Sequence, residues 1–373
     1  MPDQTDFPLD QLLFLIARSA PNPWYPAEFS REANVPREPL EHALDKLRLA
    51  RLIEFTPWES GKGQGLQLTK GGVQVLQSSR SMARLAKGIV PSFADAYDVQ
   101  AHGRISGPSE AIRAAFLRPA KPRVTQTLIA INVAVFLIGM LIAMRAPNGQ
   151  LATFDENSLR LTGAISGETL ANGQWWRLLA CCFVHFGGIH LFMNMYALWV
   201  LGPIQERLWG RVRYLTIYLI SGFVGSCVAM CLHPEATLAG ASGCIWGLLT
   251  SQLVWLLMNR NYLNQAIASQ WTRQLVTAII LNAMISFIPG ISMEAHFAGG
   301  IAGAIVAALL HVHRFGRGIA RPIALAIVIL IPILSIASLV WAMNNTQRWR
   351  HVVRIVEVRA LMRPAPANDS GEP

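Results

Sequence analysis

Charged residues are scarce in this chain of 373 residues, since Asp, Glu, Lys and Arg together make up only 14% of it. Hydrophobic residues make up 52%, which is too apolar a composition for an ordinary soluble enzyme. Long runs without charge are typical of helices that cross a bilayer, which need about 20 apolar residues. The sequence predicts seven such spans, at residues 126–144, 178–204, 214–234, 236–259, 274–293, 295–313 and 322–347.

Several kinds of site are missing from the sequence. The five cysteines all fall in or beside spans two to four, so no soluble segment has a disulfide framework, and they form no C-x-x-C pair of the kind that binds a metal. Glycine loops for phosphates or dinucleotides are absent, as is the G-x-S-x-G turn of soluble hydrolases. No span holds a carboxylate that could complete a metal site with His185, His190 and His296. We expect no metal and no other cofactor, and we expect the cysteines to be packing residues: Cys181, Cys182, Cys227, Cys231 and Cys244.

Basic residues cluster on alternate connections between the predicted spans. They precede span one and follow spans two, four and six, whereas the connections at residues 235 and 294 hold only a glutamate each. The positive-inside rule therefore places the N-terminus in the cytoplasm, and we expect a multi-pass protein of a bacterial cytoplasmic membrane. Seven spans then place the arginine-rich tail on the outer side, so either the tail crosses against the rule or span seven is misread; we favour the first, because four earlier connections agree with the rule. Contacts with lipid headgroups account for much of the net charge of +10.

Residues 1–80 are predicted to form a separate soluble domain. Helical periodicity occurs over residues 9–18, 26–33 and 37–50, and the last of these places Leu40, Leu44 and Leu47 on one face. A strand, a glycine-rich turn, a second strand and a closing helix follow. This order resembles a small α+β winged helix-turn-helix domain. Its third helix alternates basic with acidic residues, so we expect a protein partner or self-association, with nucleic acid as the less favoured alternative.

Four polar side chains lie at a similar depth in three predicted spans. Ser242 lies near the outer end of span four and His296 near that of span six, while His190 and Asn194 share one face of span two. Polar groups in hydrocarbon are costly unless they meet one another or water. A serine hydroxyl becomes a nucleophile when an imidazole accepts its proton, so Ser242 and His296 form a candidate dyad. His190 and Asn194 can donate hydrogen bonds to an oxyanion.

Small residues follow both members of this candidate dyad. Gly243 and Gly247 form one G-x-x-x-G face on span four, and Gly299 and Gly303 form another on span six. Glycines at this spacing let two membrane helices approach closely. We therefore expect spans four and six to pack backbone against backbone, which the short Ser and His side chains need in order to meet.

These features together resemble the rhomboid family of intramembrane serine proteases, over about residues 125–315. The family pattern G-x-S-G is present around Ser242, the pattern H-x-x-x-N starts at His190, and His296 is followed by spaced glycines. Further matching positions are Gly240, Gly243, Gly299 and Gly303 in the packing motifs, Trp176 and Arg177 in the first outer loop, His185 upstream of span two, and Glu206 within a G-x-x-x-E-x-x-x-G pattern.

The resemblance implies a role for each member of the site. Ser242 is implied to be the nucleophile, His296 its base, and His190 and Asn194 the lining of the oxyanion hole. Trp246 occupies the position of an aromatic residue, usually Tyr or Phe, that stacks on the catalytic histidine. The implied substrates are transmembrane segments of other membrane proteins, which enter laterally and are cleaved at small residues with water from the outer side. Span seven resembles the additional helix of a six-plus-one arrangement.

Most of these residues also have a structural explanation when taken singly. His185 can pack within a loop, Trp176 can anchor at the membrane interface, Arg177 can bind a lipid phosphate, and Glu206 can cap or brace the inner end of span two. A lone Ser242 can bond a backbone carbonyl. The combination of residues favours catalysis only for Ser242 and His296, and less firmly for His190 and Asn194.

The sequence therefore predicts an all-α polytopic membrane protein with a six-helix rhomboid core and a seventh helix, preceded by the winged-helix-like domain. Two alternatives remain: a membrane-tethered winged-helix transcriptional regulator, and an inactive rhomboid-like factor that binds membrane proteins. The expected divisions are 1–80 for the N-terminal domain, 81–124 for a linker, 125–315 for the core, 316–347 for the seventh helix and 348–373 for a polar tail.

Overall fold

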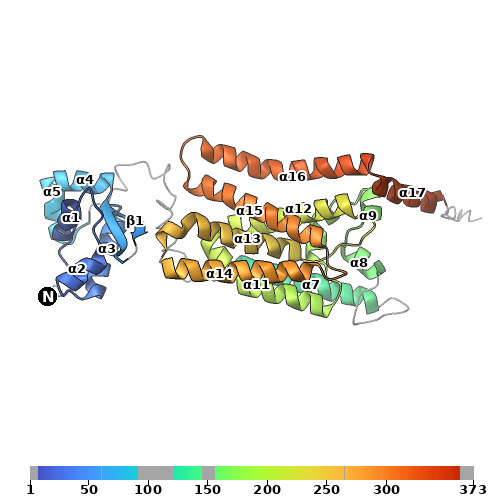
Figure 1. The fold of residues 1–373 in the computed structure, drawn as a ribbon, viewed down its shortest axis with the longest axis horizontal. Helices are drawn as coiled ribbons and strands as arrows, with labels where there is room; N and C mark the ends of the chain where they lie inside the picture. Colours follow the sequence, from blue (N-terminus) through green and yellow to red (C-terminus); the bar gives the residue numbers. More distant parts are fainter. Residues whose placement is uncertain (1–6, 60, 91–120, 145–155, 264, 362–373) are drawn as a thin grey trace, which may run out of the picture. The chain divides into compact units, whose positions relative to one another are not determined.

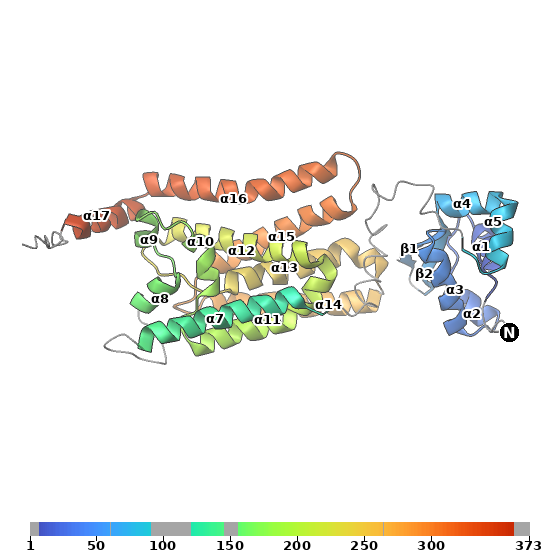
Figure 2. The ribbon, with the colours of Figure 1, turned by 180° about the vertical axis from the view of Figure 1, so that it is seen from behind.

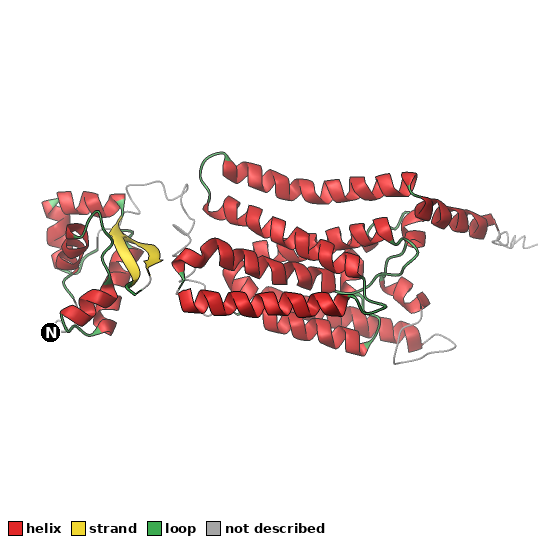
Figure 3. Cartoon of the chain, viewed as in Figure 1, coloured by secondary structure: helices red, strands yellow, loops and turns green. Residues whose placement is uncertain are grey.

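The computed structural model describes residues 7–59, 61–90, 121–144, 156–263 and 265–361, and these residues form helices and one short β-hairpin (Figures 1 and 3). The chain divides into two compact units. One unit holds the described N-terminal residues together with Leu256–Thr272, and the other holds the rest of the described chain.

The N-terminal residues follow the predicted order of three helices, a hairpin and a closing helix. One further short helix, α5, comes after them. The elements are α1 (Leu9–Arg18), α2 (Pro26–Glu32), α3 (Arg37–Leu49), β1 (Ile53–Glu59), β2 (Gly63–Leu68), α4 (Lys70–Gln77) and α5 (Ser79–Ala86). The two strands are antiparallel and pair Ile53 with Leu68. This order agrees with the expected elements, while the assignment to the winged-helix class stays a prediction.

An apolar core holds these elements together. Leu40, Leu44 and Leu47 are all buried in it, which confirms the predicted buried face of α3. Leu85 of α5 is also fully buried there, so the core extends beyond the expected boundary at residue 80. Most of the predicted linker lies outside the described residues.

Within the described residues, a long helix occurs at each of the seven predicted spans. Four of them, α7, α12, α15 and α16, are long and apolar enough to cross a membrane. The other three carry more polar residues, several of which bond neighbouring helices, and their crossing stays a prediction. The bounds are α7 (Arg123–Met144), α11 (Gly188–Trp209), α12 (Arg211–Leu232), α13 (Ser242–Asn259), α14 (Gln265–Ser286), α15 (Met293–Phe315) and α16 (Ala320–Asn345), with a 3-10 turn η3 (Arg260–Tyr262) after α13.

Helix packing places α12 against α15, and α16 packs on both of them. Helix α7 packs on α11. Figures 1 and 2 show α16 and α14 on opposite sides of this bundle. The first turns of α13 and α15 lie together, because a Cβ on Gly243 would lie 3.2 Å from the carbonyl oxygen of Ala295.

Short helices fill the connection between α7 and α11. They are α8 (Glu156–Thr162), α9 (Gly167–Ala171), α10 (Arg177–Ala180) and a 3-10 turn η2 (Cys181–Phe183). The prediction that span two starts at residue 178 was therefore wrong, because α11 begins at Gly188. Cys181 and Cys182 are buried inside the protein. A charge-free run cannot distinguish such a buried loop from the start of a span.

The described part of the predicted polar tail is a helix, α17 (Gln347–Leu361). Trp349 is fully buried, and its indole N–H donates to the carbonyl of Met230 at 3.0 Å. Arg359 reaches Glu168 of α9 at 2.8 Å. Helix α17 therefore lies at the same end of the bundle as the first loop, which agrees with a tail on the side that the sequence assigns to the outside.

Candidate active site

Ser242 is the first residue of α13, whereas the sequence placed it several residues inside a span that began at 236. The change of structure occurs at Gly240, whose φ of +136° is one that L side chains rarely adopt. An added Cβ at Gly240 would lie 2.8 Å from Cε1 and 2.9 Å from Nε2 of His190. Glycine is thus required here both for the turn and for the space beside Ser242.

His296 lies in the first turn of α15. Ser292 caps this helix, because its hydroxyl accepts a hydrogen bond from the backbone N–H of Ala295 at 3.2 Å. Nε2 of the buried His296 ring lies 2.7 Å from Oγ of Ser242. The two side chains that the sequence singled out from different spans are therefore within hydrogen-bonding distance of each other.

Glycines bring the backbones of α13 and α15 into contact. A Cβ on Gly299 would lie 2.4 Å from the carbonyl oxygen of Gly243, and one on Gly303 would lie 2.3 Å from Cα of Gly247. Neither distance leaves room for any side chain. The structure thus agrees with the predicted packing of the two G-x-x-x-G faces, which start next to Ser242 and His296.

His190 and Asn194 lie on one face of α11, as expected. Nδ1 of His190 accepts from the backbone N–H of Phe186 at 3.4 Å, and the opposite edge of the ring faces Gly240. The amide of Asn194 donates to the carbonyl of His190 at 3.0 Å and is buried. His190 therefore borders the Ser242 site directly, whereas Asn194 lies one helical turn farther along α11.

Trp246 packs beside His296, and His185 packs beside His190. The rings of Trp246 and His296 have centroids 6.0 Å apart and are inclined by 31°, so they are close but not stacked in parallel. Trp246 also meets Phe297 edge-on at 5.6 Å and lies over Gly300. His185 is buried and packs edge-on against His190, with ring centroids 5.0 Å apart.

Arg177 is a buried side chain that stabilises the connection between α7 and α11. Its buried guanidinium donates to the carbonyls of Arg160 at 2.5 Å and Ala164 at 2.9 Å, and to the side-chain amide oxygen of Gln174 at 2.5 Å. Burial lowers the pKa of Arg177, and the charge of Arg160 lowers this pKa further. These bonds use Nε and Nη1 of the guanidinium within the protein, and binding of a lipid phosphate stays a prediction. Trp176 packs on the guanidinium and is 57% exposed, as an interface anchor would be.

Glu206 connects α11 to α7 at the end of α11 farther from His190. Its buried carboxylate accepts from the backbone N–H groups of Val124 at 3.1 Å and Thr125 at 3.0 Å, in the first turn of α7. A carboxylate at a helix N-terminus is favoured by the helix dipole. The expectation that Glu206 caps or braces a helix end therefore agrees with the structure, and the helix that it caps is α7.

Comparisons with known proteins point to one family. A family model described as Rhomboid domain matches residues 172–313. A Bacillus subtilis (strain 168) protein, YdcA, whose name places it among the rhomboid proteases, is 32% identical over 38% of this chain and 69% of its own length. This chain belongs to the rhomboid family. It is accordingly an integral, multi-pass membrane protein.

Two other rhomboid relatives match this chain over less than half of their own length. The rhomboid protease GluP of Bacillus subtilis (strain 168) is 33% identical over 54% of this chain and 38% of its own length. RHOMBOID-like protein 5 of Arabidopsis thaliana is 36% identical over 39% of this chain and 47% of its own length. The chain thus spans less than half the length of these two curated relatives. The N-terminal helices and hairpin lie outside the family match.

Sequence reasoning missed several polar contacts of the rhomboid core. Oγ of Ser286, the last residue of α14, lies 2.7 Å from Nδ1 of His296. Thr250 of α13 donates to the carbonyl of Gly300 in α15 at 2.7 Å, and Gln205 of α11 donates to the carbonyl of Leu248 in α13 at 2.7 Å. Lone polar residues in apolar helices carry no motif that would have marked these contacts.

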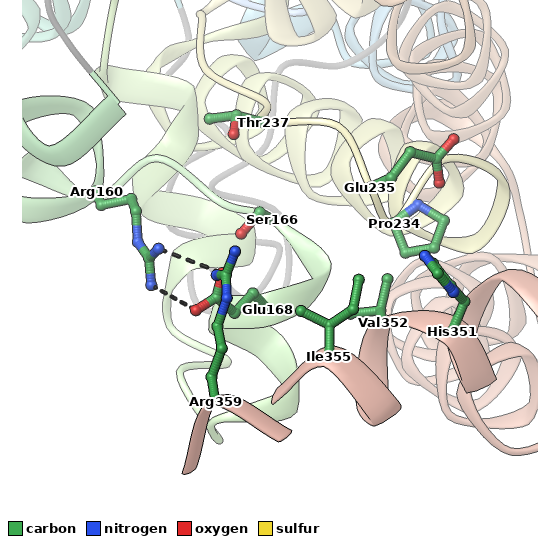
Figure 4. Close-up of a pocket in the computed structure, with 10 residues that line it drawn as sticks. All are labelled: Arg160, Ser166, Glu168, Pro234, Glu235, Thr237, His351, Val352, Ile355 and Arg359. Carbon is green, nitrogen blue, oxygen red and sulfur yellow. Dashed lines mark hydrogen bonds and ion pairs between the residues drawn. The ribbon is translucent and has the colours of Figure 1, made fainter. Parts of the chain in front are cut away.

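A cavity of about 450 Å³ opens between the first loop, the segment before Ser242 and α17. Figure 4 shows Glu168 between two arginines, with Arg160 at 3.3 Å and Arg359 at 2.8 Å from its carboxylate. Glu235 and His351 also line this cavity. Among the described residues, no group of three or more His, Cys, Asp or Glu side chains is placed to hold a metal ion.

Proposed function

We propose that this rhomboid protein is an intramembrane serine endopeptidase that cleaves transmembrane segments of other membrane proteins. The observation that carries the proposal is the distance of 2.7 Å between Oγ of Ser242 and Nε2 of His296. A hydroxyl and an imidazole at this distance can exchange a proton, which makes the serine a nucleophile. The Bacillus subtilis relative GluP is named a rhomboid protease, which supports the same chemistry.

In the proposed reaction, Oγ of Ser242 attacks the carbonyl carbon of the scissile peptide, and His296 takes the hydroxyl proton on Nε2. When the C–N bond breaks, His296 gives this proton to the leaving amine, and an ester between Ser242 and the substrate remains. Water then attacks the ester with His296 again as the base, which releases the acid and restores the hydroxyl.

The negative charge on the carbonyl oxygen needs hydrogen-bond donors during both attacks. Ser242 is at the start of α13, where backbone N–H groups have no partner within the helix, so its own N–H is one proposed donor. His190 faces Gly240 beside Ser242 and supplies a second donor. Asn194 is the third candidate, and in this geometry it also holds the carbonyl of His190.

The proposed substrates are membrane helices with small residues at the cleavage point. A helical substrate hides its carbonyls in hydrogen bonds, so it must unwind locally before attack. We propose that substrates enter laterally from the bilayer and that water reaches Ser242 from the outer side. The membrane is proposed to be a bacterial cytoplasmic membrane, with the N-terminus in the cytoplasm and the basic residues near anionic headgroups.

The N-terminal domain is proposed to bind a protein partner or a second copy rather than DNA. Two arginines of its helix α3 pair with acids of the same helix, Arg37 with Glu41 at 3.5 Å and Arg48 with Asp45 at 3.3 Å. A helix that reads DNA presents such cations to phosphates. A gel shift at several salt concentrations and a sedimentation measurement on this domain separate the two possibilities.

The experiment that tests the proposed function compares wild type, Ser242→Ala and His296→Ala in liposomes with a single-span substrate. Cleavage by wild type alone supports the protease. Equal cleavage by Ser242→Ala refutes the mechanism, and no cleavage of several substrates by wild type favours a factor that only binds membrane proteins.

A further inference from the structure

The buried hydroxyl of Ser286 contacts the face of His296 that points away from Ser242. Oγ of Ser286 lies 2.7 Å from Nδ1 of His296, while Nε2 of the same ring lies 2.7 Å from Oγ of Ser242. Both ring nitrogens therefore have a serine partner. Ser286 is 1% exposed, so the contact is shielded from water.

The proton of the Ser286 hydroxyl has another acceptor. Oγ of Ser286 donates to the backbone carbonyl of Asn282, one turn earlier in α14, at 2.8 Å. A serine hydroxyl has one proton to donate and two lone pairs that accept. When this proton is directed to Asn282, Oγ can only accept a hydrogen bond from the His296 ring, so Nδ1 must carry the ring proton.

A neutral imidazole carries one proton, so a proton on Nδ1 leaves Nε2 with a lone pair. That lone pair faces Oγ of Ser242 and can accept the hydroxyl proton. The opposite tautomer would present an N–H to Ser242 and could not act as a base. In serine hydrolases with a third member, a buried carboxylate fixes the tautomer through the same ring nitrogen.

We propose that Ser286 is a positioning residue that holds His296 in the tautomer able to accept the proton of Ser242. The proposal rests on the proposed protease function, in which Ser242 and His296 are the reacting pair. Ser286 takes the place of the missing carboxylate without bringing a charge into the apolar core, where a charge is costly. Since Ser286 ends α14, it also couples the position of this helix to the orientation of the histidine.

The kinetic test compares wild type, Ser286→Ala, Ser286→Thr and a matched control. Ser335 of α16 is the control, because its hydroxyl makes the same bond to a carbonyl one turn back, that of Ile331 at 2.9 Å, away from the site. We expect Ser286→Ala to lower kcat about tenfold, equivalent to about 1.4 kcal/mol, with KM unchanged. We expect Ser286→Thr to recover activity, because it keeps the hydroxyl, and Ser335→Ala to match wild type.

The spectroscopic test measures the tautomer of His296 directly. In protein labelled with 15N-histidine, the His296 signals are assigned by their loss in His296→Gln. We expect a protonated Nδ1 and an unprotonated Nε2 in wild type, and a population with the proton on Nε2 in Ser286→Ala. An unchanged tautomer in Ser286→Ala overturns the proposal, even if activity falls.

Failure of the proposed protease function can be distinguished from failure of the proposed role of Ser286. If wild type cleaves no substrate, the protease proposal fails, but the 15N measurement still decides whether Ser286 sets the tautomer. If wild type is active and Ser286→Ala keeps the full kcat, Ser286 has only a packing role and the proposal is wrong.

Discussion

The close contact between α13 and α15 makes activity sensitive to the substitution Gly299→Ala. A Cβ at Gly299 would lie 2.4, 3.0 and 3.1 Å from the carbonyl oxygen, carbonyl carbon and Cα of Gly243. All three are backbone atoms, which cannot swing aside as a side-chain tip can. In Gly299→Ala the helices must therefore separate by about 1 Å to reach an ordinary van der Waals contact.

This separation acts on the reacting pair, because Gly299 lies one turn after His296 and Gly243 directly follows Ser242. The distance of 2.7 Å between Oγ and Nε2 would rise to about 3.7 Å, beyond hydrogen-bonding reach. A misplacement of about 1 Å can cost about 100-fold in rate. We therefore expect kcat/KM for a single-span substrate to fall about 100-fold. The gain of about 1 kcal/mol in helix propensity offsets part of the 1–3 kcal/mol of overpacking, so the variant should fold.

Gly188→Ala in the first turn of α11 is the matched control, since a Cβ there meets no atom within 4 Å. It should keep kcat/KM within about twofold of wild type. The assay is substrate cleavage in liposomes, with thermal unfolding measured on the same samples. If Gly299→Ala keeps wild-type kcat/KM, the close approach of the two helices does not set the geometry of the pair.

Three further substitutions test other parts of the structure. Glu206→Gln should lower the unfolding free energy by about 1–2 kcal/mol, because the amide keeps an acceptor for the start of α7 but loses the charge; an unchanged thermal unfolding curve would contradict this. Trp349→Ala should release α17 and speed trypsin cleavage at Arg350, and an unaltered cleavage rate would show that the indole does not hold the helix. The hydrogen bond to Glu59 and, to a smaller extent, burial of the phenol raise the pKa of Tyr25 to about 12. The stabilisation by the neutral phenol is therefore complete below the ordinary pKa of about 10 and is lost as pH rises through about 12. The absorbance difference between wild type and Tyr25→Phe should titrate near pH 12. A midpoint near pH 10 would refute the contact.

Periodicity and combinations of motifs were sufficient to predict the environment of residues that depend mainly on their own segment. Leu40, Leu44 and Leu47 repeat at helical spacing and are buried as predicted. Ser242 and His296 could be paired because a hydroxyl and an imidazole in apolar runs need polar partners, and glycines followed each of them. These are properties of short segments, which the sequence displays directly.

The remaining features of the fold and the site depend on packing between distant segments, which the sequence does not display. The apolar residues before Gly188 resemble the start of a span but form a buried loop, because neighbouring helices rather than lipid cover them. Helix α17 does show apolar residues at helical spacing in Trp349, Val352 and Val356, but the arginines between them favoured a polar tail. Ser286 has no motif, and only the turn between α14 and α15 brings it to His296.

The most direct test of Ser242 as a nucleophile activated by His296 is the site of covalent trapping. Protein in detergent would be treated with a serine-directed fluorophosphonate, and the adduct located by mass spectrometry of peptides. We expect one adduct on Ser242 in wild type and almost none in His296→Ala. An adduct on another serine, or equal labelling of Ser242 in His296→Ala, would contradict it.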